Sequence, residues 1–276
     1  MLAPHFVVFT DLDGTLLDHH TYRWEPAHEA LDELERRRIP LIFVSSKTRA
    51  EIEVVRRKIG NAHPFISENG GGVFIPHDYF KLRIEGASRV GRYQCLALAR
   101  PYREIVVELE ELAEEAEASV VGFHQMSGRE IAQNTGLPLR EAELARQRDF
   151  DEPFFFAGAG EVQVQRFVQL AKQRGLEVER GGRFWHLFSG SNKGRAVREV
   201  ISLYRRTWRR RFRAVGLGDS ANDLPLLAAV DVPILLPHPD GAHDRAVLAR
   251  LPRVTRGSAP GPEGWNQTVL RILGGT

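Results

Sequence analysis

Short apolar runs that end abruptly in polar loops, with helical patterns between them, constrain the fold of this chain more than any other feature. Phe6–Phe9 is followed at once by a loop with two aspartates, and Leu41–Val44 by two serines and a lysine. Residues 64–67 end in the same way. Fully apolar strands are typical of sheets buried on both faces, and strands that alternate with helices form parallel sheets with right-handed crossovers. The pattern therefore predicts an α/β fold with a Rossmann-like doubly wound parallel sheet.

A middle stretch of the chain interrupts this alternation. Its apolar runs are separated by helical patterns in an order typical of an α+β domain, and they cover residues 95–98, 120–123, 154–157 and 184–188. The alternation returns with a helical pattern after Lys193 and an apolar run before Asp219. We therefore expect a discontinuous core domain at residues 1–84 and 189–276, with an α+β domain inserted at residues 85–188.

Composition excludes several classes of protein. With 42% hydrophobic and 27% charged residues the chain is typical of folded, water-soluble proteins, and its net charge of +2 gives no reason to expect nucleic acid as a partner. The run Arg205–Arg211 is typical of a solvated helix end. No apolar stretch approaches the roughly 20 residues that span a bilayer, so we expect no membrane contact.

The single cysteine, Cys95, excludes an intramolecular disulfide and a thiolate metal cluster. Because residues 1–5 also lack the features of a signal peptide, we expect a cytoplasmic protein. Only five of the 38 basic residues are lysine. This imbalance indicates either a thermophilic source or a GC-rich genome.

Polar side chains gather where the predicted strands end. In an open parallel sheet, ligands bind outside the carboxyl ends of the strands, and the residues that this end collects are Asp11, Asp13, Ser45, Ser46, Lys193, Asp219, Asn222 and Asp223. Carboxylates brought together repel each other unless a cation neutralises them, and oxygen ligands with open positions suit Mg²⁺. A lysine and helix N-termini add the positive groups that hold a phosphate. The sequence therefore predicts a magnesium site for phosphoryl transfer.

Four of these segments together resemble a known family. The segment Asp11–Leu17, the serine after the second strand, Lys193 and the segment Gly218–Asp223 are similar, in this order, to the four motifs of haloacid-dehalogenase-like phosphatases. The resemblance implies that Asp11 is a nucleophile that becomes an aspartyl-phosphate and that Asp13 is the general acid and base.

The same resemblance implies a role for the remaining polar residues. Lys193 and Ser45 would bind the phosphoryl group, although Ser46 could take the role of Ser45. Mg²⁺ would be held by the Asp11 carboxylate, the Asp13 backbone carbonyl and Asp219, with Asn222 and Asp223 at or behind the ligand shell.

The inserted domain lies where large-cap members of this family carry an α/β cap. Four segments, at residues 44–51, 67–70, 148–154 and 181–187, are most similar to the branch that hydrolyses mannosyl-3-phosphoglycerate. The resemblance thus implies a small phosphorylated sugar acid as substrate, and the residues expected to contact it are Lys47, Glu68 and Asn69 in the core and Arg148, Arg183 and His186 in the cap. A cap arginine would bind the glycerate carboxylate bidentately.

Two other functions fit parts of this pattern. One is a large-cap phosphatase for another sugar phosphate, such as sucrose phosphate. The other is a phospho-aspartate signalling receiver, which also uses an aspartate, Mg²⁺, a hydroxyl and a lysine on a parallel sheet. A receiver needs neither a cap of a hundred residues nor an acid two residues after its phosphorylated aspartate, and this chain has both. His186 could equally be a hydrogen-bonded core histidine, and Arg148 and Arg183 could be surface ion-pair residues.

Overall fold

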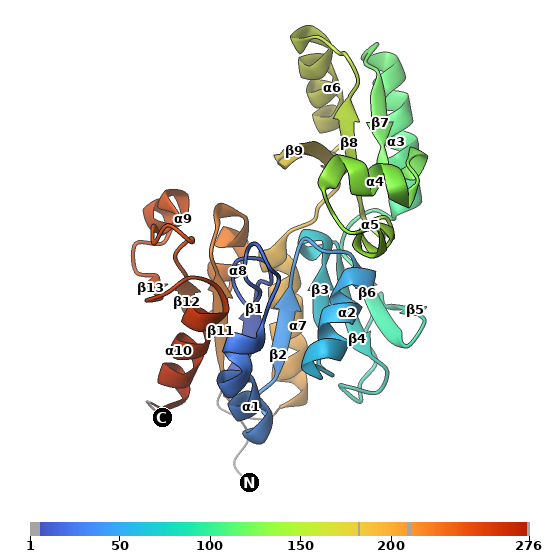
Figure 1. Ribbon diagram of the computed structural model, residues 1–276. Coiled ribbons are helices and arrows are strands. Elements are labelled where there is room, and N and C mark those ends of the chain that lie inside the picture. The colour runs from blue at the N-terminus through green and yellow to red at the C-terminus, as the bar shows by residue number, and fades with distance from the viewer. Residues whose placement is uncertain (1–5, 182, 209–210, 275–276) are drawn as a thin grey trace.

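The computed structural model describes residues 6–181, 183–208 and 211–274, which form a large α/β core and a smaller body above it (Figure 1). The stretch 1–5 lies outside the described residues, as do Gly182 and the arginines at 209 and 210 of the predicted helix end.

The core is built on one nine-stranded sheet. Its strands are β1 (Phe6–Thr10), β2 (Leu41–Val44), β3 (Phe65–Ser67), β4 (Gly72–Pro76), β5 (Ser88–Val90), β6 (Tyr93–Ala97), β11 (Arg213–Gly218), β12 (Val232–Leu235) and β13 (Thr255–Arg256). They lie in the order β13-β12-β11-β1-β2-β3-β4-β6-β5. All neighbours from β13 to β3 are parallel, and β4, β6 and β5 complete the sheet with antiparallel pairs. The predicted parallel α/β core is confirmed.

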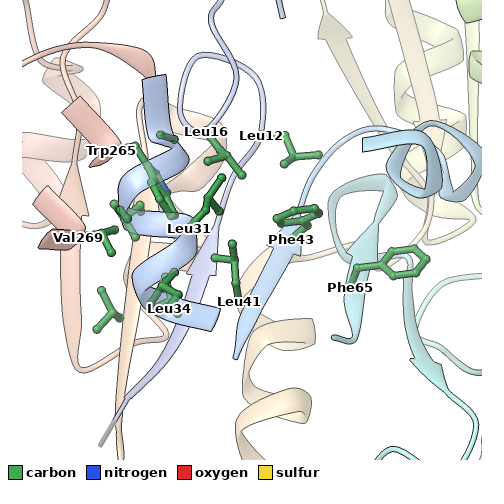
Figure 2. Close-up of a cluster of buried hydrophobic side chains, with 14 of the residues drawn as sticks. Leu12, Leu16, Leu31, Leu34, Leu41, Phe43, Phe65, Trp265 and Val269 are labelled. Atoms are coloured by element: carbon green, nitrogen blue, oxygen red, sulfur yellow. The ribbon is translucent and has the colours of Figure 1, made fainter. Parts of the chain in front are cut away.

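Helices cover both faces of this sheet. They are α1 (His28–Arg36), α2 (Arg49–Ile59), α7 (Lys193–Thr207), α8 (Leu224–Leu227), α9 (Arg245–Arg250) and α10 (Gly261–Gly274). Alternate side chains of β1 enter opposite layers, since Val8 packs in the cluster that contains Leu31 and Trp265 of α1 and α10, whereas Val7 packs against α7. Figure 2 shows the first of these clusters, to which Trp265 of α10, Leu31 of α1 and Leu41 of β2 all belong. Burial on both faces explains why the strands are continuously apolar.

Local signals in the sequence set the ends of α2. The Thr48 side chain accepts a hydrogen bond from the Glu51 backbone N–H, and the Glu51 carboxylate accepts one from the Thr48 N–H, which completes a capping box. Gly60 ends the helix in the left-handed conformation, with φ of 78°. Both features are as predicted, and they fix where the loop after β2 ends.

The smaller body is the cap, an antiparallel sheet with helices. Its strands, in spatial order, are β7 (Val120–Gly122), β8 (Asp151–Phe156), β10 (Phe184–Phe188) and β9 (Glu177–Gly181), and its helices are α3 (Tyr102–Glu115), α4 (Gly128–Thr135), α5 (Leu139–Ala145) and α6 (Glu161–Gln173). Leu109 of α3 and Phe167 of α6 pack on Phe154 and Leu187, on one face of this sheet. The opposite face carries Asp151 and His186, because side chains alternate along a strand.

The expected start of the cap at residue 85 is wrong. β5 and β6 lie beyond that residue, yet both pair within the core sheet, with β6 next to β4. The apolar run at residues 95–98, which includes Cys95, is therefore mostly a core strand. The inserted segment begins after β6, and its first helix is α3.

The cap is also attached to the core away from its two connecting segments. Phe150, just before β8, packs in the core cluster that contains Phe74. It fits there because Gly71 and Gly72 have no side chains, and a Cβ atom on Gly71 would lie 2.6 Å from the Phe150 Cβ. A cap side chain thus completes the hydrophobic core of the other domain.

Among the described helices, none has the length and hydropathy needed to cross a membrane.

Candidate active site

The loop after β1 is locked to the loop after β11. Gly14 has φ of 77°, and a Cβ atom there would lie 2.6 Å from Asp219 Oδ2, so glycine suits both the conformation and the close approach. Thr15 donates a hydrogen bond from its hydroxyl to Asp219 Oδ1 at 3.3 Å. The parallel pairing of β1 with β11 brings the two loops side by side.

Three carboxylates and one ammonium group meet at this edge of the sheet. One oxygen each of Asp11, Asp219 and Asp223 lies within 4.8 Å of the others, and all three residues are buried. Lys193, at the start of α7, donates hydrogen bonds to Asp11 Oδ1 at 2.8 Å and to Asp223 Oδ1 at 2.7 Å. The other Asp223 oxygen accepts backbone N–H bonds from Asp219 and Ser220, which fixes its orientation.

The pKa values of this cluster reflect its surplus of negative charge. Burial, followed by the charge of Asp223, raises the pKa of Asp219 to about 6. The same two causes raise the pKa of Asp11 well above its ordinary value, although Lys193 opposes them. Three carboxylates against one ammonium favour a further cation, and an all-oxygen donor set suits a hard divalent ion. The cluster can therefore hold a metal.

Asp13 lies apart from this cluster and has its own cation. Its Oδ1 is 3.0 Å from Lys47 Nζ, and Lys47 in turn lies over the Tyr22 ring at 4.9 Å from its centroid. The sequence predicts Lys47 as a substrate contact, but its ammonium group is engaged with Asp13. Tyr22 was not identified from the sequence, because nothing in its neighbourhood marks an aromatic residue as the support of a lysine.

The two serines after β2 differ in accessibility. Ser45 is buried, and its hydroxyl accepts the Lys47 N–H at 3.2 Å. Ser46 is exposed and lines a cavity that lies between core and cap. Both thus stay candidates for binding phosphate, Ser45 from inside the loop and Ser46 from the cavity wall.

A cavity of about 580 Å³ separates the core loops from the face of the cap sheet that carries Asp151 and His186. It is lined by Ser46, Glu68, Asn69, Arg148, Asp151, Glu179, Arg180, His186, Phe188, Ser191, Ala221, Asn222 and Pro225. Four predicted substrate contacts, Glu68, Asn69, Arg148 and His186, are among these. Asn222 donates a side-chain hydrogen bond to Asn69 at 3.1 Å, which links two core loops at the cavity floor.

Asp151 holds Arg148 and His186 together on the cap side of this cavity. Its carboxylate lies 3.0 Å from His186 Nδ1 and 3.5 Å from the Arg148 guanidinium. Arg148 is largely buried, and its Nε has no hydrogen-bond partner among the described residues. The Asp151 carboxylate was not identified from the sequence as a site residue. Its position in β8, on the same face as His186, is the signal that could have found it.

Glu68 lines the cavity but also has a structural task. Its two carboxylate oxygens accept the backbone N–H groups of Asp149 and Phe150 at 2.9 and 2.8 Å, across the junction of core and cap. Burial raises the pKa of Glu68 to about 8. The residue therefore positions the segment that carries Arg148, as well as facing the cavity.

The structure does not place Arg183 at this cavity, which corrects the prediction. Its guanidinium donates to the Asn134 carbonyl at the end of α4. Arg180 in β9 does line the cavity, but its guanidinium lies over the Trp185 ring, 5.7 Å from the centroid. Arg148 and His186 are thus the cap side chains best placed to meet a ligand.

Comparison with known proteins identifies the class. A family model for haloacid dehalogenase-like hydrolases matches residues 8–88. Solved structures that cover nearly the whole chain share the fold. A Thermotoga maritima protein has a TM-score of 0.68 over 98% of this chain and 97% of its own, at 16% identity. A haloacid dehalogenase-like hydrolase from Bacteroides thetaiotaomicron has a TM-score of 0.67 over 97% of this chain and 99% of its own, also at 16% identity.

Curated relatives are closer in sequence. The chain is 39% identical, over 97% of both chains, to a glucosyl-3-phosphoglycerate/mannosyl-3-phosphoglycerate phosphatase of Methanococcoides burtonii. It is 34% identical, over 83% of its own length and 90% of the relative, to a mannosyl-3-phosphoglycerate phosphatase of Pyrococcus furiosus. The chain therefore belongs to the haloacid dehalogenase-like hydrolases, and within that class it is a phosphatase of the same family as these two relatives. The hypothesis of a signalling receiver is wrong.

Proposed function

We propose that this phosphatase removes the phosphate from mannosyl-3-phosphoglycerate or its glucosyl counterpart, giving the glycosylglycerate and inorganic phosphate in compatible-solute synthesis. The observation that carries the proposal is the buried hydrogen bond from Lys193 to Asp11, in a cluster whose Asp223 directly follows Asn222 of the cavity between core and cap. The cap side of that cavity presents Arg148 and His186. The first pair suits a phosphate ester, and the second suits a substrate that also bears a carboxylate. The names of the two relatives support this substrate class.

Asp11, Asp219 and the Asp13 carbonyl would hold Mg²⁺, with Asn222 and Asp223 beside them. The ion would supply positive charge against the phosphate oxygens and the attacking carboxylate, which otherwise repel each other. Lys193 would bind a phosphate oxygen while it keeps Asp11 and Asp223 oriented. The hydroxyl of Ser45 or Ser46 would donate to another phosphate oxygen.

Hydrolysis would occur in two steps on Asp11. In the first, an Asp11 oxygen attacks phosphorus, the ester P–O bond breaks, and Asp13 donates a proton to the leaving alkoxide of the glycerate. In the second, the Asp13 carboxylate takes a proton from water as the water oxygen attacks phosphorus. The aspartyl P–O bond then breaks, which releases phosphate and restores the Asp11 carboxylate. Lys47 would keep the Asp13 side chain in place between the two steps.

One assay tests this proposal. Phosphate release would be measured on mannosyl-3-phosphoglycerate, glucosyl-3-phosphoglycerate, sucrose phosphate and p-nitrophenyl phosphate, each with Mg²⁺, with Zn²⁺ and after exhaustive chelation. We expect the two glycosyl-3-phosphoglycerates to have the highest kcat/KM, Mg²⁺ to activate, Zn²⁺ to replace it poorly and chelation to stop turnover. A preference for sucrose phosphate would assign another substrate, and full activity after chelation would refute the metal role. A cytoplasmic location stays a prediction.

A further inference from the structure

A second cavity, of about 280 Å³, lies at the end of α2 that is remote from the proposed active site. It is lined by Arg56, Arg57, Gly60, Asn61, Ala62, Pro76, Arg92 and Tyr93. The loop with Ser45 and Ser46 precedes α2, whereas this cavity lies beside the last turn of the helix. Eleven residues at 1.5 Å each put roughly 16 Å of helix between them. The two cavities share no lining residue.

The cavity gathers positive charge without an acidic lining residue. Arg56 is only 5% exposed, and among the residues that the structure describes it has no carboxylate within ion-pair distance. Its guanidinium donates to the Tyr93 hydroxyl at 2.8 Å and to the His63 carbonyl, and it lies over the Phe65 ring. Aromatic and carbonyl contacts of this kind orient a guanidinium but do not neutralise it.

A second arginine converges on the same atom. Arg92 donates from Nε to the Tyr93 hydroxyl at 3.0 Å, so two guanidinium groups share one acceptor. The nearest acidic group is Glu53, which lies 3.7 Å from Arg92 but also pairs with Arg49. Exposed Arg57 adds a third positive charge, with no ion pair in the described part of the chain.

The charges facing this space do not balance. Three guanidinium groups meet one shared carboxylate and the C-terminal end of α2, whose dipole contributes about half a negative charge. Burial and the neighbouring Arg92 lower the pKa of Arg56, and burial and Arg56 together lower that of His63 to about 4. Like charges held this close are stable together when an anion lies between them.

We propose that this cavity binds a small tetrahedral oxyanion of the phosphate type, at a site separate from the catalytic one. Arginine forks match the oxygens of such an anion in geometry and charge. A volume of 280 Å³ is several times the roughly 30 Å³ that one water molecule occupies, so the anion fits with part of its hydration shell. The proposal does not depend on which ester the enzyme hydrolyses.

The side chain of Arg56 provides a readout of this site alone. Its Nε–H is buried and has no hydrogen-bond partner among the described residues, so its resonance is expected to be resolved in a ¹⁵N-correlated spectrum. The full-length protein, freed of metal with chelator, would be titrated with inorganic phosphate, with sulfate and with chloride at matched ionic strength. We expect a saturable shift of this resonance with phosphate and sulfate but not with chloride.

Paired variants show where the anion binds. The first pair of substitutions is Arg57→Gln with Arg92→Gln, which should leave the core packing intact because both side chains are exposed. The second pair, Arg198→Gln with Arg205→Gln on α7, is the control and removes the same charge elsewhere. We expect the first pair to weaken the response at least tenfold and the second to leave it unchanged. Calorimetric titration with phosphate under the same conditions should count one site fewer in the first pair than in the wild type.

Two results would overturn the proposal. One is an Arg56 resonance that moves no more with phosphate than with chloride. The other is a saturable response, with the same number of phosphate sites as the wild type, in the Arg57 and Arg92 variant. Neither result bears on phosphate release at the active site, so failure here and failure of the proposed function are distinguishable.

Discussion

Asp11 and Asp13 lie two residues apart, yet they meet different cations. Asp11 accepts a hydrogen bond from Lys193 inside the buried cluster, whereas Asp13 pairs with Lys47 outside it, with about a third of the Asp13 side chain exposed (34%). A carboxylate held beside phosphate-binding groups suits attack on phosphorus. A partly exposed carboxylate suits proton exchange with the leaving group and water.

Amide substitutions separate these two roles. Asp11→Asn should form no covalent phosphoryl-enzyme and should lose nearly all turnover. Asp13→Asn should lose roughly 10²–10⁴-fold, the usual worth of a general acid or base, but should still be phosphorylated slowly by p-nitrophenyl phosphate, whose leaving group needs no proton. Steady-state rates and the intact mass after rapid quenching measure both. Phosphate release by Asp11→Asn at more than a few per cent of wild type would remove it as nucleophile.

Two cap arginines form a matched pair for testing specificity. Arg148→Gln removes a buried guanidinium at the cavity, and Arg183→Gln removes an exposed one that contacts α4. Loss of a charged hydrogen-bond pair costs about 1.5–3 kcal/mol, so Arg148→Gln should lower kcat/KM for mannosyl-3-phosphoglycerate at least tenfold. Arg183→Gln should change it little, and p-nitrophenyl phosphate should be little affected by either. Equal losses on both substrates in Arg148→Gln would mean that Arg148 supports the cap instead.

At the scale of elements, the start of α2 joins the phosphate-side loop to the cap. The Thr48 hydroxyl caps the helix, and it also lies 3.0 Å from the Leu144 carbonyl in the cap. Thr48→Ala should lower the free energy of unfolding by about 1 kcal/mol, the usual cost of losing an N-cap. Thr48→Ser keeps a hydroxyl and should retain most of this stabilisation. Urea denaturation of the three proteins measures this. Equal stabilities of the three proteins would show that the N-cap hydrogen bond of Thr48 contributes nothing to the free energy of unfolding.

The sequence predicts elements well where burial on both faces makes a strand apolar from end to end. β1, β2 and β11, with the loops that follow them, were predictable for that reason. β6 is mostly apolar as well, apart from Gln94, but whether such a strand joins the core sheet or the cap depends on pairing with β4, a contact that periodicity does not encode.

For the cap residues of the site, too, the sequence does not encode the contacts that decide which side chain faces the cavity. Arg183 and Arg148 look alike in sequence, because both are arginines in segments similar to one family. Which of them faces the cavity depends on the contact that holds Arg183 at the end of α4 and on the placement of Phe150, both of which are tertiary contacts. The carboxylate and lysine cluster was predictable, because parallel strands bring their carboxyl ends to one edge whatever the cap does.

For the whole molecule, Glu68 makes the junction of core and cap sensitive to pH. Burial raises its pKa in the folded protein to about 8, above its ordinary value of 4.5. The folded state therefore binds this proton more tightly than the unfolded state, and the stability it adds is complete below about pH 4.5 and lost as the pH rises through about 8.

This linkage gives a measurable slope. Between pH 5 and 8 the free energy of unfolding of the wild type, relative to Glu68→Gln, should fall by up to about 1.4 kcal/mol per pH unit. Urea titrations of both proteins across this range provide the difference, which cancels the contributions of the other titrating groups. A flat difference would mean that Glu68 is already ionised at pH 5 in the folded state.

Phe150 lies in the cap sequence but in the core's hydrophobic cluster, above two glycines that have no side chains to fill the space. Core and cap are therefore not interchangeable modules. A chimaera that exchanges caps at the two connecting segments alone would bring a new residue to this socket, and any bulk at positions 71 and 72 of the recipient would collide with it. Gly71, Gly72 and Phe150 must be exchanged together, so in recombination among relatives these three positions should be inherited as one unit.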